Sequence, residues 1–206
     1  ELSIPHVVEN PPDRCYFCKK ALFTQIKALA QKMEIQQVVD GSNLDDERDY
    51  RPGMLALAEL EIKSPLRIAQ LAKEEIRALS QMLRQIGFTK AEIRELSKEQ
   101  GLPTWDKPSF ACLASRIPYG EPITKEKLAM IEEAELFLMT LGFKQLRVRC
   151  HDKLARIEVP EVDIPFLLNG AIREKIADSF AKMGFTYTAI DIKGYRTGSL
   201  NEALKQ

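Results

Sequence analysis

The sequence predicts a protein that mixes α-helices and β-strands in two parts, residues 1–120 and 121–206. In the first part, apolar residues at helical spacing alternate with short apolar runs and glycine- or proline-marked turns, as in an α/β domain. In the second part, strict alternation of apolar and polar residues over 144–159 predicts a β-hairpin between two helices. Because the pattern of apolar and polar residues changes after Gly120, we place the boundary between the two parts near residue 121.

Length, charge and cysteine content narrow the class of protein. The chain has 206 residues, enough to bury a core in one large domain or two small ones. Lys plus Arg and Asp plus Glu number 30 each, so an anion site has to be local and nucleic acid is not an expected partner. No apolar run approaches the roughly 20 residues of a membrane span, and the start has no basic and apolar leader. Four cysteines are too few for a disulfide scaffold. We therefore expect a cytoplasmic protein with reduced thiols.

The first part opens with turn residues, a CxxC motif at Cys15 and Cys18, and a helix through Ala30. A short strand at 38–39 then leads into an acidic, turn-rich loop. Ligands of open α/β sheets bind at the carboxyl ends of strands, which makes this loop a candidate wall of a binding site. The alternative is an ordinary Asp-Gly turn. The candidate residues are Asp40, Gly41, Ser42 and Asn43.

The middle of the chain contains a short internal repeat. Residues 73–80 and 90–97 match each other, and the second copy opens with a capping box formed by Thr89 and Glu92. Two copies are too few for a solenoid. We therefore expect two successive amphipathic helices, after an earlier helix over 55–60.

Residues 107–120 form a stretch with prolines near both ends, which favours an ordered loop over a helix or strand. It carries Cys112, Ser115 and Arg116 within five residues. Ordered loops between regular elements often carry chemistry. The alternative is a connector between domains that buries an inert free cysteine.

The second part predicts the order α-β-β-α-β around a small three-stranded sheet. The first helix is capped by Thr124 and runs to Leu141, the second covers 164–183, and the last strand covers 186–192. The hairpin between them has one apolar face, which includes Cys150. Its other face, the arginine face, carries Arg147, Arg149, Arg156 and Glu158. This face fits either a solvated surface with cross-strand ion pairs or a clamp for phosphate or carboxylate, because the arginine fork binds both in bidentate fashion.

Three of the cysteines are candidate ligands of one metal site. Cys15 and Cys18 can bind one metal ion or cluster, and Cys112 would be a third ligand that leaves one position open. Cys150 falls on the apolar face and is assigned to the core. These residue types do not choose between zinc, an iron–sulfur cluster and a redox dithiol.

Several separated blocks resemble one family. They lie at 10–19, 40–46, 51–53, 64–66, 101–108, 111–120, 147–149 and 194–199. In these blocks the sequence closely resembles the ATP-dependent sulfur transferases of nickel-pincer nucleotide (lactate racemase cofactor) biosynthesis. That family belongs to the PP-loop ATP pyrophosphatase superfamily. The resemblance implies that 1–120 is the C-terminal part of a PP-loop parallel-sheet domain, and that 121–206 is a small α+β domain for substrate binding or oligomerisation.

The resemblance also implies an activity. ATP with Mg²⁺ adenylates a carboxylate of a pyridinium mononucleotide, and a sulfur nucleophile then displaces AMP to leave a thiocarboxylate. Some relatives give up the sulfur of a cysteine that matches Cys112. Others hold a 4Fe-4S cluster on three cysteines, which here would be Cys15, Cys18 and Cys112. The resemblance implies catalytic roles for Ser115 and Arg116. The implied binding residues for the nucleotide substrate are Arg147, Arg149, Glu158 and Arg196.

The sequence departs from the family in two ways. The glycine-rich pyrophosphate loop of the family is not in the chain, so we expect a fragment or truncated form that binds ATP poorly by itself. The repeated helix is the second departure. Family members form trimers and hexamers, so a homo-oligomer is expected. Two alternative functions are thiolation of a tRNA base and an inactive truncated paralogue with a structural zinc site.

Overall fold

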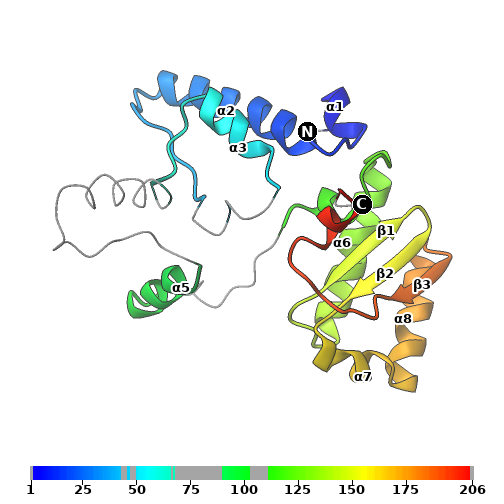
Figure 1. The fold of residues 1–206 in the computed structure, drawn as a ribbon. Helices are drawn as coiled ribbons and strands as arrows, with labels where there is room; N and C mark the ends of the chain where they lie inside the picture. Colours follow the sequence, from blue (N-terminus) through cyan, green and yellow to red (C-terminus); the bar gives the residue numbers. More distant parts are fainter. Residues whose placement is uncertain are drawn as a thin grey trace. The chain divides into compact units, whose positions relative to one another are not determined.

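The computed structural model describes residues 2–42, 46, 50–65, 67, 90–102 and 111–204 (Figure 1). The chain divides into two compact units. The sheet unit comprises Glu1–Pro12 and Pro108–Gln206, and the helical unit comprises Asp13–Lys107. This division does not coincide with the boundary that we placed near residue 121. Both the segment before the CxxC motif and the loop of Cys112 belong to the sheet unit.

The helical unit contains α2 (Arg14–Lys32), α3 (Gly53–Glu59) and α5 (Lys90–Glu99), and α2 packs against α3. The helix predicted through Ala30 is confirmed, with the CxxC motif in its first turns. The second copy of the repeat is α5, as predicted. The first copy, 73–80, and Thr89 of the capping box lie outside the described residues. Among the residues described, no helix combines the length and apolar character needed to cross a membrane.

The strand predicted at 38–39 is smaller than expected. Within the described residues it amounts to one parallel bridge, between Val39 and Lys63. The amide of Asp40 also donates to the carbonyl of Lys63 at 2.9 Å. These contacts place Asp40 at the carboxyl end of a parallel pair of chain segments.

The sheet unit follows the predicted α-β-β-α-β order, except that two helices stand in place of the second one. Its three strands are β1 (Arg147–His151), β2 (Leu154–Glu158) and β3 (Tyr187–Ile190), in the spatial order β1-β2-β3. β1 and β2 form the predicted antiparallel hairpin, and β3 pairs with β2 in parallel. The remaining elements are short α1 (Pro5–Val8), η2 (Leu113–Arg116), α6 (Lys125–Thr140), η3 (Glu161–Asp163), α7 (Ile164–Leu167), α8 (Gly170–Lys182) and η4 (Ser199–Leu204).

The ends of α6 match the prediction, whereas the second helix does not. Thr124 accepts a hydrogen bond from the amide of Lys127 and caps α6. The single helix predicted over 164–183 is wrong, because the chain breaks into α7 and α8. Asn169 separates them and accepts from the amide of Ala171, so a local side-chain cap starts a new helix.

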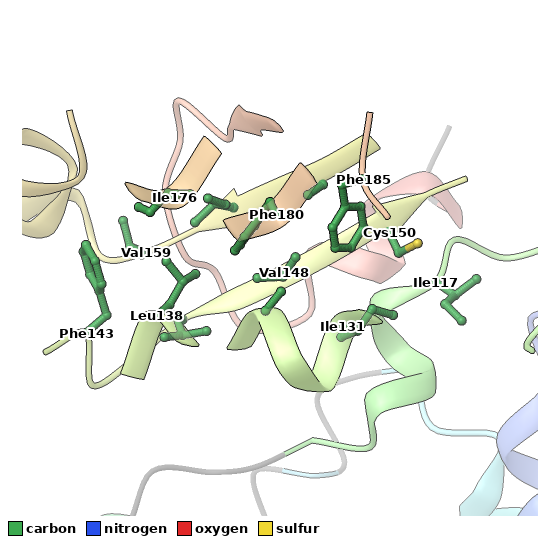
Figure 2. Close-up of a cluster of buried hydrophobic side chains, with 14 of the residues drawn as sticks. Ile117, Ile131, Leu138, Phe143, Val148, Cys150, Val159, Ile176, Phe180 and Phe185 are labelled. Carbon is green, nitrogen blue, oxygen red and sulfur yellow. The ribbon is translucent and has the colours of Figure 1, made fainter. Parts of the chain in front are cut away.

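The hydrophobic core lies where α6 and α8 pack against the sheet (Figure 2). Val148 and Cys150 of β1 contribute to it, together with Ile131 of α6 and Phe180 of α8. The prediction that Cys150 is a core residue is confirmed. Burial raises the pKa of the Cys150 thiol to about 11, so this thiol stays protonated at neutral pH.

Candidate functional site

The loop that carries Cys112 is rigidly held in the sheet unit. Cys112 is exposed and lies just before η2. Its carbonyl oxygen accepts from the amide and the hydroxyl of Ser115, at 2.9 and 2.7 Å, and from Nη1 of Arg116 at 3.1 Å. The main chain at Cys112 is therefore fixed while its thiol faces outward.

Arg116 is the buried anchor of this loop. Its guanidinium forms a bidentate pair with Glu135 of α6, at 2.8 and 2.9 Å, and only 1% of the residue is exposed. Glu135 also accepts from the amide of Val148 at 2.9 Å. Arg116 therefore ties the Cys112 loop to both α6 and β1. These contacts show a structural role, and the predicted catalytic roles of Arg116 and Ser115 stay predictions.

Three of the four residues of the arginine face, Arg147, Arg149 and Glu158, are buried, and Arg156 is partly exposed, so the alternative of a fully solvated face is wrong. Arg149 and Glu158 form a bidentate pair at 2.9 Å in both bonds, and Glu158 is 0% exposed. Arg149 also donates to the carbonyl of Ser115 and to the hydroxyl of Ser199. The chain covers this face with η2 and η4, and cross-strand ion pairs persist beneath that cover.

Glu158 resolves a clash of like charges in the hairpin. The register places Arg149 directly opposite Arg156, an unfavourable pairing of two cations. Oε1 of Glu158 accepts from both guanidinium groups, at 2.9 and 3.2 Å. One buried carboxylate therefore compensates two arginines.

Arg147 has a different environment. Its guanidinium lies over the ring of Tyr195, 5.2 Å from the ring centroid, and Nη1 donates to the carbonyl of Leu146. Burial and the nearby charge of Arg116 lower the pKa of Arg147 from its usual range. An anion that approached this guanidinium would offset both effects.

A second group of charges extends the arginine face to the chain's C-terminal tail. Asp191 pairs with Arg156 at 3.1 Å and with Arg196 at 3.2 Å, and Arg196 pairs with Glu202. Burial alone would raise the pKa of Asp191. The hydrogen bonds from Arg196 and from the amide of Lys193, together with the arginine charges, hold that pKa below its usual value.

Asp191 is expected to make stability depend on acid pH. Because its folded-state pKa is lowered, its contribution is complete above the ordinary carboxyl pKa of about 4 and fades as pH falls through the lower folded value. We expect Asp191→Asn to cost about 2 kcal/mol at pH 7. The difference in free energy of unfolding between this variant and the original protein should become smaller in acid. Urea unfolding at a series of pH values measures this difference, and a difference that stays constant with pH would contradict the assignment.

In the helical unit, Asp40 is the centre of a second polar cluster. Its carboxylate accepts from the hydroxyls of Ser42 and Ser64, and Nζ of Lys19 lies 3.6 Å away. Burial would raise the pKa of Asp40, but the two serine hydrogen bonds and the Lys19 charge lower it. Asp40 thus joins α2 to the ends of both bridged segments. Gly41 is exposed with open space around it, and Asn43 lies outside the described residues.

The CxxC motif lies on one side of α2. Cys15 and Cys18 are three residues apart in the helix, so their side chains share a face; Cys15 is exposed and Cys18 is partly exposed. Nη2 of Arg14 contacts Sγ of Cys15 at 3.8 Å. Gly53 leaves no room for a side chain, since a Cβ there would lie 3.1 Å from the carbonyl oxygen of Cys15. The start of α3 therefore packs closely on the motif.

The three candidate ligands fit a thiolate-bound group in chemistry and accessibility. Cys15 and Cys18 belong to the helical unit and Cys112 to the sheet unit. Taken one unit at a time, the described residues contain no group of three His, Cys, Asp or Glu side chains suited to a metal ion. The three-cysteine site therefore stays a prediction.

Sequence reasoning missed three residues that build the site in the sheet unit, namely Glu135, Asp191 and Ser199. A signal existed for Glu135, because it lies at helical spacing from the buried residues Ile131 and Leu138. A charge on an apolar helix face indicates a buried partner. The contacts of Ser199 with Arg149 and Glu158 join distant parts of the chain and leave no local pattern.

Fold and site together define a mixed α/β protein that presents an exposed cysteine beside a buried network of arginines and carboxylates. No family model matches the chain. The chain is 41% identical to an uncharacterized protein of Synechocystis sp., over 99% of this chain and 70% of that protein. It is 33% identical to the pyridinium-3,5-bisthiocarboxylic acid mononucleotide synthase of Lactiplantibacillus plantarum, over 98% of this chain and 67% of that protein. An uncharacterized protein of Methanocaldococcus jannaschii is 32% identical, over 95% of this chain and 69% of that protein.

The identity to the synthase extends over nearly the whole chain and two thirds of the relative. The chain therefore belongs to the family of pyridinium-3,5-bisthiocarboxylic acid mononucleotide synthases.

Proposed function

We propose that this protein is an ATP-dependent sulfur transferase that converts a carboxylate of a pyridinium mononucleotide into a thiocarboxylate. Family membership supports the reaction class, since the named relative is a synthase of a bisthiocarboxylic acid mononucleotide. The observation that carries the proposal is the exposed thiol of Cys112 on a loop fixed by Arg116 and Glu135. A nucleophilic or ligating sulfur needs this combination of access and fixed position.

Activation comes first in the proposed reaction. A carboxylate oxygen of the substrate attacks the α-phosphorus of Mg²⁺-bound ATP, and pyrophosphate leaves. Sulfur then attacks the acyl carbon of the adenylate, and AMP leaves with the bonding electron pair. We assign ATP to the loop of Asp40, Gly41, Ser42 and Asn43, within a PP-loop type of parallel sheet. The bridge at Val39 and the exposed Gly41 support this assignment.

The arginine face binds the substrate in this proposal. Arg147 and Arg149 hold the nucleotide phosphate, Glu158 keeps Arg149 oriented, and Arg196 adds charge from the tail. The bidentate Arg149–Glu158 pair supports such a pre-oriented fork. Ser115 supports the Cys112 loop. We further propose that the protein works in the cytoplasm as a homo-oligomer, a trimer or a hexamer.

Cys15, Cys18 and Cys112 are proposed to hold a 4Fe-4S cluster, for which the all-thiol donor set is suited. When bound, such a cluster supplies a renewable sulfide at its open iron. The alternative within the same reaction is that Cys112 gives up its own sulfur. Cys150 takes no part, because its thiol is buried and protonated.

The deciding measurement is the iron and acid-labile sulfide content after anaerobic purification and reconstitution. We expect about four of each per chain. Cys15→Ala should lose both, and the matched control Cys150→Ala should retain both. Stoichiometric zinc without iron would instead favour an inactive paralogue. Binding of tRNA to a filter at low salt would favour the tRNA-thiolating alternative.

A further inference from the structure

Tyr195 is fixed in the C-terminal tail of the sheet unit by the backbone around it. Its amide donates to the carbonyl of Val159, the residue after β2, at 2.8 Å. Gly194 has a φ of 65°, and a Cβ there would lie 2.7 Å from the same carbonyl oxygen, so this close approach requires glycine. The carbonyl of Gly194 also accepts from Nη1 of Arg196 at 2.7 Å. The tail therefore holds the ring of Tyr195 at a set place beside the sheet.

The ring of Tyr195 lies against the guanidinium of Arg147. Cζ of Arg147 lies 5.2 Å from the ring centroid, and Nη2 donates to the hydroxyl of Tyr195 at 3.4 Å. Because 3.4 Å is long for a hydrogen bond, the ring face contributes more to this contact than the hydroxyl does. Arg147 is only 7% exposed, and the attraction between a cation and an aromatic face is strongest where water is excluded.

Two other arginines of the face and the tail are held by carboxylates. Arg149 pairs with Glu158 at 2.9 Å. Arg196 pairs with Asp191 at 3.2 Å. A carboxylate partner offsets the charge of an arginine and competes with any other anion for its donors. An aromatic ring carries no net charge, so the contact with Tyr195 orients a guanidinium and leaves its positive charge in place.

We propose that Tyr195 is a positioning residue that holds the guanidinium of Arg147 for the substrate phosphate without neutralising it. The inference rests on the proposed function, which assigns that phosphate to the arginine face. Tyr195 acts through Arg147, with which it is in contact. Loss of the ring should therefore weaken binding of the phosphate and leave recognition of the rest of the substrate unchanged.

Binding of nicotinate mononucleotide, a pyridinium carboxylate mononucleotide, tests this role without turnover. NMR titration of the full chain measures the dissociation constants, including those of weak complexes. Tyr195→Leu removes the aromatic face and should weaken binding about tenfold, the scale of a desolvated cation–π contact. Tyr195→Phe keeps the ring and should bind within about twofold of the original protein, because it loses only the long hydroxyl contact. If Tyr195→Leu does not fold, Tyr195→Met takes its place.

Three controls show whether the effect passes through Arg147 and the phosphate. Nicotinate riboside lacks the phosphate, so its affinity should be the same for the original protein and for Tyr195→Leu. In an Arg147→Met background, Tyr195→Leu should cause no further loss of mononucleotide binding, because the two residues act together. Tyr187→Leu removes an exposed tyrosine elsewhere in the sheet unit and should bind like the original protein.

Unchanged mononucleotide binding in Tyr195→Leu would overturn the positioning role. A loss that persists in the Arg147→Met background, that is equal for the riboside, or that is as large in Tyr195→Phe would overturn it too. If the original protein binds no mononucleotide, the assignment of the phosphate to the arginine face fails, and the positioning role fails with it. The two failures are distinguishable, because one is seen in the original protein and the other only in its variants.

Discussion

Replacing Cys112 with alanine is expected to abolish thiocarboxylate formation and leave the sheet unit folded. The thiol is exposed, whereas the contacts of the loop involve its backbone carbonyl, so the substitution removes sulfur without disturbing the anchor. Product formation, followed by chromatography of the reaction mixture, should fall by about 10³-fold, the scale seen when one member of a catalytic group is removed. Undiminished product would contradict the central role of Cys112.

The mass of the protein, measured by mass spectrometry during the same reaction, distinguishes the two sources of sulfur. If Cys112 is sacrificed, attack by its thiolate forms a thioester, and β-elimination then releases the thiocarboxylate and leaves dehydroalanine. The protein becomes lighter by the mass of H₂S after one turnover. If Cys112 is a ligand, its mass stays constant and repeated turnover continues. Cys150→Ala is the control and should keep product formation, since that thiol lies in the core.

Arg116→Met is expected to cause the largest loss of stability in the sheet unit. It leaves the carboxylate of Glu135 buried without its charge partner, which typically costs about 3–5 kcal/mol. Arg116→Lys should recover only part of this cost, because an ammonium group cannot reproduce the bidentate fork or reach the carbonyls of Ala111 and Cys112 as well. Urea unfolding measures both variants.

A double variant tests the cause of this loss. Glu135→Gln in the Arg116→Met background removes the unpaired charge and keeps an oxygen that accepts from the amide of Val148. We expect the double variant to be more stable than Arg116→Met alone. Glu202→Gln is the control in the same unit. It breaks an exposed pair with Arg196, so its effect should be far smaller. Equal losses in all variants would rule out the buried charge as the cause.

Local patterns in the sequence predicted much of the sheet unit. The alternation over 144–159 fixed the hairpin and its apolar face, and Thr124 marked the start of α6. The break between α7 and α8 was missed although Asn169 and Gly170 signal it, because the apolar spacing on both sides was taken as one helix. Helices and strands depend largely on residues that are close in the sequence, so a single sequence shows the patterns that predict them.

The burial of the arginine face was not predictable in the same way. Alternation shows which side chains share a face, and it does not show what covers that face. The cover comes from η2 and η4, through contacts such as that of Ser199 with Arg149, fifty residues away. The pairs of Arg116 with Glu135 and of Asn10 with the turn at Pro118 are also long-range. The candidate residues could be identified in the sequence from their residue types. Their partners could be identified only from the folded structure.

The buried Cys150 gives this protein a built-in reporter of unfolding. With its pKa near 11 and no exposed surface, its thiol resists alkylation as long as the sheet unit is closed. Cys15 and Cys112 are exposed in the native state, so we expect their thiols to react there. A brief pulse of iodoacetamide would thus label the outer thiols at once and Cys150 only in molecules that have opened. The alkylated fraction at Cys150 reports the population of open molecules in the unmodified sequence, without an engineered cysteine.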